Sequence, residues 1–173
     1  MTQTATDAAT DARAQVHSVT PVLVFRHGTA EAIDLYVSLL PNSRILNVVR
    51  SEGGMIPAGQ VMTATFELDG TVYNAFDGGD HFQFSDGFSL MVTCATQEEI
   101  DRLWAALTAN GGEPGRCGWL KDRWGLSWQI IPADLGDMLS NPAGGDTRKA
   151  GEAMMTITKL DIAALRAAYN GAS

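Results

Sequence analysis

Cysteine and histidine are scarce in this chain, which has 173 residues but only two cysteines and three histidines. Cys94 and Cys117 form no CxxC motif, so the sequence indicates neither a thiolate metal site nor a redox pair. Two isolated thiols suit a reducing compartment, and we expect a cytoplasmic protein. A disulfide between the two cysteines stays open as the less favoured alternative.

Positive charge and long apolar runs are lacking as well. The 12 lysines and arginines are outnumbered by 20 acidic residues, which gives a net charge of −8. This balance argues against binding to nucleic acid or to an anionic membrane, because both require basic patches. No apolar run approaches the ~20 residues that span a bilayer. Residues 1–17 lack the basic and apolar regions of a signal peptide, and we expect a disordered leader there.

A weak internal repeat organises the rest of the chain. An apolar strand segment at 23–25 is followed by a helical stripe of apolar residues, and the same pattern recurs from Leu90 at a constant offset. The two stripes are Ile33, Tyr36, Val37 and Leu40, and Ile100, Leu103, Trp104 and Leu107. Gly70 and Gly125 open matching extended segments at a smaller offset. The second half has therefore lost residues that the first half keeps in its 51–60 loop.

Each half is predicted to consist of a strand, a helix and three further strands. We place the strands at 20–25, 44–50, 60–69 and 71–77, and at 87–94, 113–117, 118–124 and 126–132. Asp69-Gly70 is a hairpin signal, and Thr96 is a good N-cap for the second helix. Helical patterns follow at 133–141, 145–155 and 159–169. The predicted fold is α+β, with two βαβββ modules (about 18–80 and 86–132) and a helical tail at 133–170, in a single domain.

Several segments resemble one family. They are Thr20–Phe25, Ala30–Tyr36, Phe76–Gly79, Gln97–Trp104, the tryptophan-rich stretch Cys117–Gln129, and Ala153–Met155. They are similar to the PhnB-like branch of the vicinal oxygen chelate (glyoxalase/bleomycin resistance) superfamily. This branch often carries the label 3-demethylubiquinone-9 3-methyltransferase. The resemblance implies two facing curved sheets, each with a concave pocket, and a homodimer.

Metal-dependent members of this superfamily bind one divalent cation with His or Gln from the first strands and Glu from the last strands. The internal repeat places Asn74 and Gln129 at the last-strand positions. Neutral amides bind such a cation weakly, and the first strands offer neither imidazole nor carboxylate. We therefore expect no metal and no other cofactor. A partial site that uses His81 or Asp77 is the alternative.

Strand alternation sorts the side chains that would line the pocket. If Gln129 faces the concave side, Ser127 faces it too, while Trp128 and Ile130 pack under helices. The same rule places Asn74 and Phe76 in the pocket and buries Tyr73 and Ala75. The candidate ligand-binding residues are Asn74, Phe76, Trp119, Lys121, Ser127 and Gln129. This set supplies no general base and no nucleophile at neutral pH.

Other reactive side chains have structural interpretations that we favour. Trp119 and Trp124 are expected in packing rather than stacked on a ligand. The 121–123 turn is expected to be solvated or to form a local ion pair rather than to hold an anion. Cys117 is expected to be a buried strand thiol rather than a nucleophile. Asp77 most simply belongs to a loop, although it ends a pocket strand. Glu67 would be a candidate general base only if its side chain faced inward.

Two classes of function remain. The favoured one is a module that binds a small organic molecule without a metal. The alternative is an enzyme, either a metal-dependent lyase, isomerase or dioxygenase-like protein, or the methyltransferase that the family label implies. Methyl transfer from S-adenosylmethionine usually needs a glycine-rich loop between a strand and a helix, and none of the Gly-Gly pairs is expected in such a place.

Overall fold

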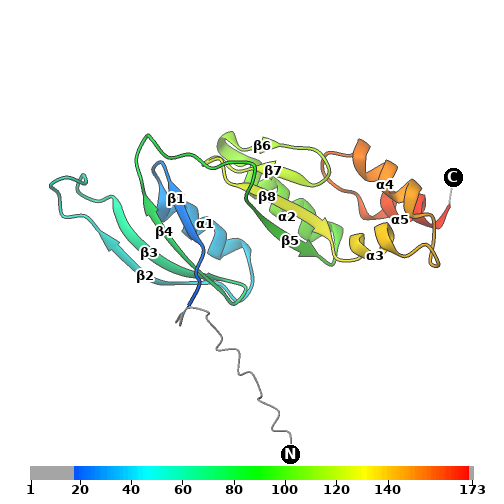
Figure 1. Cartoon of the computed structure of the whole chain (residues 1–173), viewed down its shortest axis with the longest axis horizontal. Coiled ribbons are helices and arrows are strands. Elements are labelled where there is room, and N and C mark those ends of the chain that lie inside the picture. The colour runs from blue at the N-terminus through cyan, green and yellow to red at the C-terminus, as the bar shows by residue number, and fades with distance from the viewer. Residues whose placement is uncertain (1–17, 172–173) are drawn as a thin grey trace, which may run out of the picture.

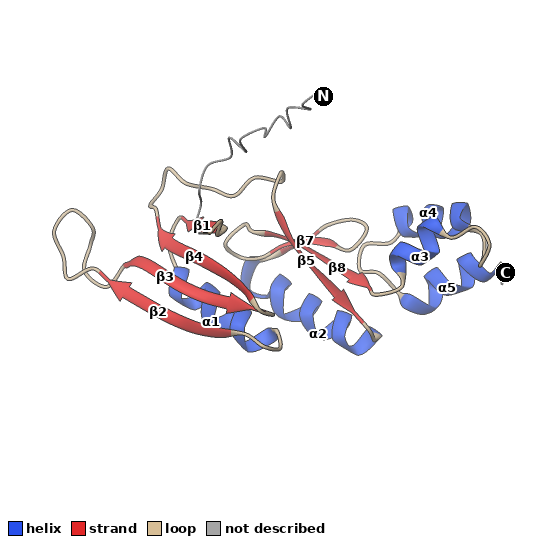
Figure 2. Ribbon diagram, turned by 60° about the horizontal axis from the view of Figure 1, so that its bottom comes forward, coloured by secondary structure: helices blue, strands red, loops and turns tan. Residues whose placement is uncertain are grey.

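The computed structural model describes residues 18–171, which form two βαβββ halves and a helical tail arranged in sequence along the long axis (Figures 1 and 2). The first half contains β1 (Val22–Phe25), α1 (Thr29–Leu39), β2 (Arg44–Arg50), β3 (Val61–Leu68) and β4 (Thr71–Asp77). The second contains β5 (Ser89–Cys94), α2 (Gln97–Thr108), the short helix η1 (Ala109–Gly111), β6 (Glu113–Pro114), β7 (Trp119–Lys121) and β8 (Ser127–Pro132). The predicted α+β class is confirmed.

The two sheets have the same strand order. It is β1-β4-β3-β2 in the first half and β5-β8-β7-β6 in the second. In each half the first strand runs parallel to the last strand, and the remaining neighbours are antiparallel. The sheets do not close on themselves, so β1 and β5 are both edge strands. The internal repeat therefore reflects a structural duplication.

The outer strands of the second half are shorter than predicted. Glu113–Pro114 and Trp119–Lys121 replace the expected strands at 113–117 and 118–124. Cys117 and Gly118 both have left-handed backbones, with φ of 57° and 83°, which an extended strand does not allow. A turn at 122–125 then separates β7 from β8, where Gly125 N–H donates to the Asp122 carbonyl.

Two local signals form as the sequence predicts. Asp69 and Gly70, with φ of 43° and 82°, make the tight turn between β3 and β4. At the start of α2, the Thr96 side chain accepts from the Glu99 N–H, while the Glu99 carboxylate accepts from the Thr96 N–H. This capping box satisfies two backbone donors that the first helical turn leaves without partners.

One hydrophobic core joins the two halves. Ala64 and Ala75 from the first sheet, together with Trp128 and Ile130 from the second, are fully or almost fully buried in it. The Tyr36 ring of α1 lies 4.9 Å from the Trp128 ring, in an edge-to-face arrangement. Each large side chain buried there contributes roughly 1.5–3 kcal/mol, so this shared core holds the halves together.

The tail forms α3 (Leu135–Ser140), α4 (Thr147–Thr156) and α5 (Ile162–Asn170), close to the predicted helices. These helices enclose a small second core of Leu135, Met138, Ala150, Leu160 and Leu165. Within residues 18–171, none of the helices has the length and apolar character needed to cross a membrane. The predicted leader at 1–17 lies outside the described residues.

Candidate functional site

Each sheet has one covered face and one open face, and strand register fixes what lies at the centre of the open face. In the first sheet Asn74 on β4 pairs with Val22 on β1. In the second, Gln129 on β8 pairs with Met91 on β5. The two amides therefore occupy equivalent positions in the duplicated halves, and an aliphatic side chain lies opposite each of them.

The open face of the second sheet contains a cavity of about 230 Å³. Trp119, Lys121 and Ser127 line it, which brings three of the six predicted residues together. Gln129 lies beside Trp119 in the β7–β8 ladder and donates from its Nε2 to the Ser89 hydroxyl at 2.8 Å. The side chains of one sheet face thus offer an indole ring, an ammonium group, a hydroxyl and an amide.

Two carboxylates share this cavity, and sequence reasoning missed both. Asp86 forms an ion pair with Lys121 at 2.7 Å, and Glu113 lies opposite Lys121 in the β6–β7 ladder. The hydrogen bond from Lys121 lowers the pKa of Asp86, and the same bond raises the pKa of Lys121. The cavity therefore presents an ion pair rather than a lone cation. No local signal marks these acids, because strand register places Glu113 beside Lys121 and the turn before β5 brings Asp86 to it.

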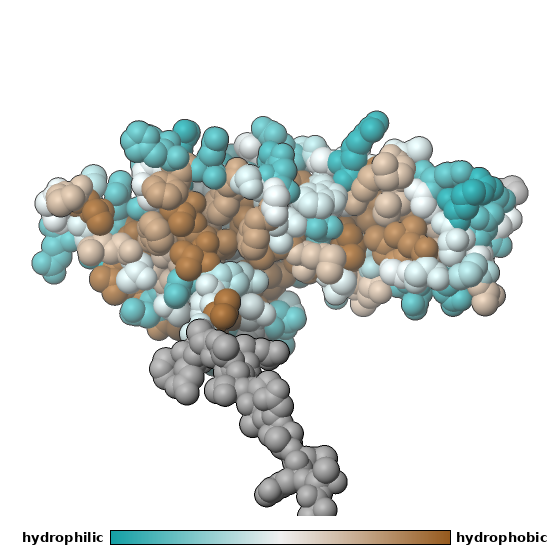
Figure 3. All heavy atoms as spheres, in the orientation of Figure 1, coloured by the Kyte–Doolittle hydropathy of each residue, from teal (hydrophilic) through white to brown (hydrophobic). Residues whose placement is uncertain are grey.

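The other two predicted residues lie on the first sheet and line neither this cavity nor the larger one described below. Asn74 accepts from the Thr65 hydroxyl at 2.9 Å, and Phe76 is half-buried. Their sheet exposes apolar side chains instead, since Val22 is 51% exposed. Figure 3 shows apolar atoms gathered over this part of the molecule.

The four central positions of the open faces do not fit a divalent cation. Val22 and Met91 have no oxygen or nitrogen ligand, and the two amides opposite them are uncharged. A hard or borderline divalent ion prefers carboxylate or imidazole ligands. In the described part of the chain no group of three His, Cys, Asp or Glu side chains is placed to hold an ion.

At Asp122, the prediction that the 121–123 turn is solvated or forms a local ion pair is wrong. The Asp122 side chain is only 3% exposed and accepts four hydrogen bonds. One oxygen accepts from Tyr36 Oη at 2.5 Å and from Trp128 Nε1 at 2.9 Å. The other accepts from the backbone N–H groups of Trp124 and Leu126. Burial raises the pKa of Asp122, while these four hydrogen bonds oppose the shift.

Asp77 and Glu67 both have structural partners. Asp77 is the last residue of β4 rather than a loop residue. It accepts from the backbone N–H and hydroxyl of Thr29 and from the Val61 N–H, so it ties the start of α1 to two strands. Glu67 lies on the open face but pairs with Arg44 at 2.9 Å. Because both carboxylates have these partners, neither is free to act as a general base.

Cys117 does not lie in a buried strand, which contradicts the favoured interpretation. It is half-exposed, and its Sγ is 3.7 Å from Met155 Sδ. Cys94 is buried and both thiols are free, so the alternative disulfide does not form.

Trp124 packs into the shared core as predicted, edge-on to Phe25 and Tyr36.

The histidines and the glycine pairs also have clear locations. His27 bonds Asp80 through Nε2 at 3.1 Å on the surface, His81 is exposed, and His17 lies outside the described residues.

Among residues 18–171, no Gly-Gly pair lies between a strand and a helix that follows it. The glycine-rich loop typical of S-adenosylmethionine-dependent methyl transfer is therefore absent from the described part of the chain.

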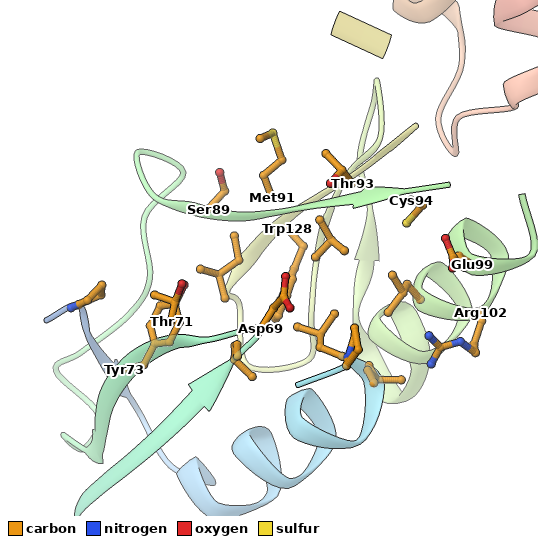
Figure 4. Close-up of a pocket in the computed structure, with 18 of the residues that line it drawn as sticks. Asp69, Thr71, Tyr73, Ser89, Met91, Thr93, Cys94, Glu99, Arg102 and Trp128 are labelled. Carbon is orange, nitrogen blue, oxygen red and sulfur yellow. The ribbon is translucent and has the colours of Figure 1, made fainter. Parts of the chain in front are cut away.

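A larger cavity of about 480 Å³ lies between the two halves (Figure 4). It extends along β5 and is bounded by the end of α1, the β3–β4 turn and α2. None of the six predicted residues lines it. Sequence reasoning could not find this cavity, because it exists only where the halves meet.

Comparison with known proteins supplies the family. The family model described as 3-demethylubiquinone-9 3-methyltransferase matches residues 17–131. A putative 3-demethylubiquinone-9 3-methyltransferase, the PhnB protein from Bacillus cereus, is 34% identical, with a TM-score of 0.62. The match covers 66% of this chain and 98% of the PhnB chain. Among curated proteins, none matches this chain.

More distant solved structures support the fold alone. A protein from Pseudomonas aeruginosa is 21% identical with a TM-score of 0.54, over 66% of this chain and 96% of its own. A mutant of the fosfomycin resistance protein FosX from Listeria monocytogenes, complexed with Mn(II) and 1S,2S-dihydroxypropylphosphonic acid, is 13% identical. Its TM-score is 0.50, over 73% of this chain and 100% of its own. The family-model match and the PhnB protein together show that the chain belongs to the PhnB-like, 3-demethylubiquinone-9 3-methyltransferase family.

Proposed function

We propose that this protein binds a small organic molecule on the open face of its second sheet and needs no metal ion to do so. The observation that carries the proposal is the pairing of neutral amides with aliphatic side chains at the centres of both open faces. Metal-dependent members of this fold use Glu at the last-strand positions. This chain has the uncharged amides Asn74 and Gln129 at those positions. Such a lining recognises a ligand by shape and hydrogen bonds.

The contacts available in and beside the 230 Å³ cavity define the kind of ligand. The half-buried Trp119 indole offers a flat apolar surface for a planar or aliphatic group. Ser127 in the cavity and Gln129, next to Trp119 in the β7–β8 ladder, offer neutral hydrogen-bonding groups. The Lys121–Asp86 pair offers a donor and an acceptor side by side. A neutral or zwitterionic molecule with a planar part satisfies these groups better than a strong anion does, because Asp86 already compensates the Lys121 charge.

We further propose a cytoplasmic homodimer. The open face of the first sheet leaves large apolar side chains in solvent, with Val22 51% and Val72 40% exposed. Contiguous exposed apolar surface of this kind is typical of association sites. Two free cysteines support a reducing compartment.

A thermal-shift screen of metabolites and aromatic drugs, made with protein stripped of metal by a chelator, tests the binding proposal. We expect a ligand that raises the melting temperature without added metal. Gln129→Ala should then weaken that ligand at least about tenfold, the loss expected from removing one good polar contact. Gln83→Ala, in an exposed loop, is the matched control and should have no effect. Unchanged affinity in Gln129→Ala would overturn the site assignment.

A further inference from the structure

The 480 Å³ cavity runs along the hydrogen-bonding edge of β5. Seven consecutive residues of this segment line it, from Phe88 to Cys94. Successive side chains of a strand point to opposite faces, so a cavity over one face would contact only every second residue. Contact with all seven means that the cavity follows the strand edge, where the outward-pointing backbone groups lie.

That edge is unpartnered in the described chain. β5 pairs only with β8, and half of the backbone groups of an edge strand point away from its neighbour. Apart from the β5–β8 ladder, no hydrogen bond within residues 18–171 reaches the backbone of Ser89 to Thr93. The cavity therefore holds a row of free donors and acceptors at strand spacing.

The walls beside this edge are mainly apolar. Leu39, Leu40 and Pro41 come from the end of α1, Leu68 from β3 and Leu103 from α2. An extended ligand that pairs with β5 would place alternate side chains against these walls. The volume lies within the range of small-molecule sites, ~300–1,000 Å³, which suits a short ligand rather than a folded partner.

One cation marks the end of the cavity near Cys94. Arg102 is the single Lys or Arg side chain in the lining, and no described carboxylate pairs with it. The two acids in the lining already have donors. Glu99 is held in the capping box, and Asp69 accepts from Asn42 Nδ2 at 3.3 Å. Figure 4 shows Arg102 on α2, at the opposite end of the cavity from Tyr73.

We propose that this groove binds a short, free oligopeptide in extended conformation, which adds to the edge of β5 and places its C-terminal carboxylate at Arg102. Because Arg102 lies at the Cys94 end, the peptide runs parallel to β5. Main-chain hydrogen bonds would give affinity, and the apolar walls would select aliphatic side chains. This site is separate from the 230 Å³ cavity, with which it shares no lining residue.

Calorimetric titration of the full chain tests the proposal. The probes are a panel of N-acetylated tripeptides of Leu, Val and Phe, each prepared as the free acid and as the C-terminal amide. We expect at least one acid to bind, and its amide to bind at least about tenfold more weakly, since a charge-assisted hydrogen bond is lost. N-methylation of the backbone amide that pairs with β5 should also abolish binding.

Variants of the protein test whether the C-terminal carboxylate of the peptide binds at Arg102. Arg102→Gln should remove the preference for acid over amide, while Arg148→Gln, an exposed side chain on α4, should preserve it. Equal affinity for acid and amide, or no binding across the panel, would overturn the proposal. So would a change in the solution mass of Arg102→Gln, because that result would place a second copy of the chain on the β5 edge.

Discussion

Asp122 is the residue on which the contact between the halves depends most. A buried carboxylate with four donors is stable only while all of them remain, because each donor left without an acceptor keeps its desolvation cost. Tyr36 comes from the first half and Trp128 from the second, so the same oxygen joins both halves. A charged side chain buried at this junction fixes how α1 packs on the second sheet.

Replacement of Asp122 by Asn should therefore be costly. The new amide group donates where Trp128 Nε1 or the backbone N–H groups also donate, so at least one donor loses its acceptor. We expect urea unfolding to show a loss of about 3 kcal/mol for Asp122→Asn and about 1.5 kcal/mol for Tyr36→Phe, which removes one hydrogen bond to a charged group. A loss under about 1 kcal/mol for Asp122→Asn would show that the network does not hold the halves together.

The two cysteines should differ in reactivity. Burial, followed by the charge of Glu99, raises the pKa of Cys94 to about 11, so at pH 8 only about one molecule in a thousand carries the reactive thiolate. Cys117 is half-exposed. We expect a thiol-specific disulfide reagent to modify one cysteine per native chain quickly and both after unfolding. Cys117→Ser should abolish the fast phase; a fast phase that survives this substitution contradicts the assignment.

At the scale of elements, side-chain hydrogen bonds and an ion pair help to attach the tail to the second half. Gln97, in the first turn of α2, donates from Nε2 to the Leu160 carbonyl at 3.1 Å and accepts from the Ile162 N–H at 2.9 Å. These are the two bonds that a neighbouring strand would make. Lys159 adds an ion pair with Asp101 of the same helix. The start of α5 is thus held by α2 as well as by its own small core.

Gln97→Ala should loosen this attachment without unfolding the sheets. We expect faster amide hydrogen exchange in Ile162–Asn170 and unchanged exchange in α1, because opening free energies are local to each cooperative unit. Gln83→Ala serves again as the control. Equal acceleration in α1 and α5 would mean that the tail does not open as a separate unit.

Patterns confined to one element were predictable from the sequence. The alternation of side chains along β8 correctly predicted that Trp128 and Ile130 are buried. The internal repeat correctly predicted that Asn74 and Gln129 occupy equivalent positions. Features that depend on how elements meet were not predictable. The burial of Asp122, the Asp86–Lys121 pair and the groove along β5 arise from contacts between segments far apart in the sequence, and no periodic pattern records them.

At the scale of the whole molecule, the dimer proposal rests on the unclosed sheets and on the apolar side chains exposed on the open face of the first sheet. Light scattering should give a mass near twice the 18.5 kDa of one chain. Val22→Asp, which places a charge on the open face of the first sheet, should lower that mass at micromolar concentration. Met155→Asp, on the exposed side of α4, is the matched control. A monomeric mass for the unmodified protein would refute the dimer.

We propose above all that this PhnB-like protein binds its ligand without a metal. Elemental analysis of protein purified without chelator tests it most directly. Because the central side chains of the open faces are Val22, Asn74, Met91 and Gln129, we expect far less than one Zn, Mn, Fe or Ni per chain. One equivalent of any of these metals that stays bound through gel filtration would contradict the claim.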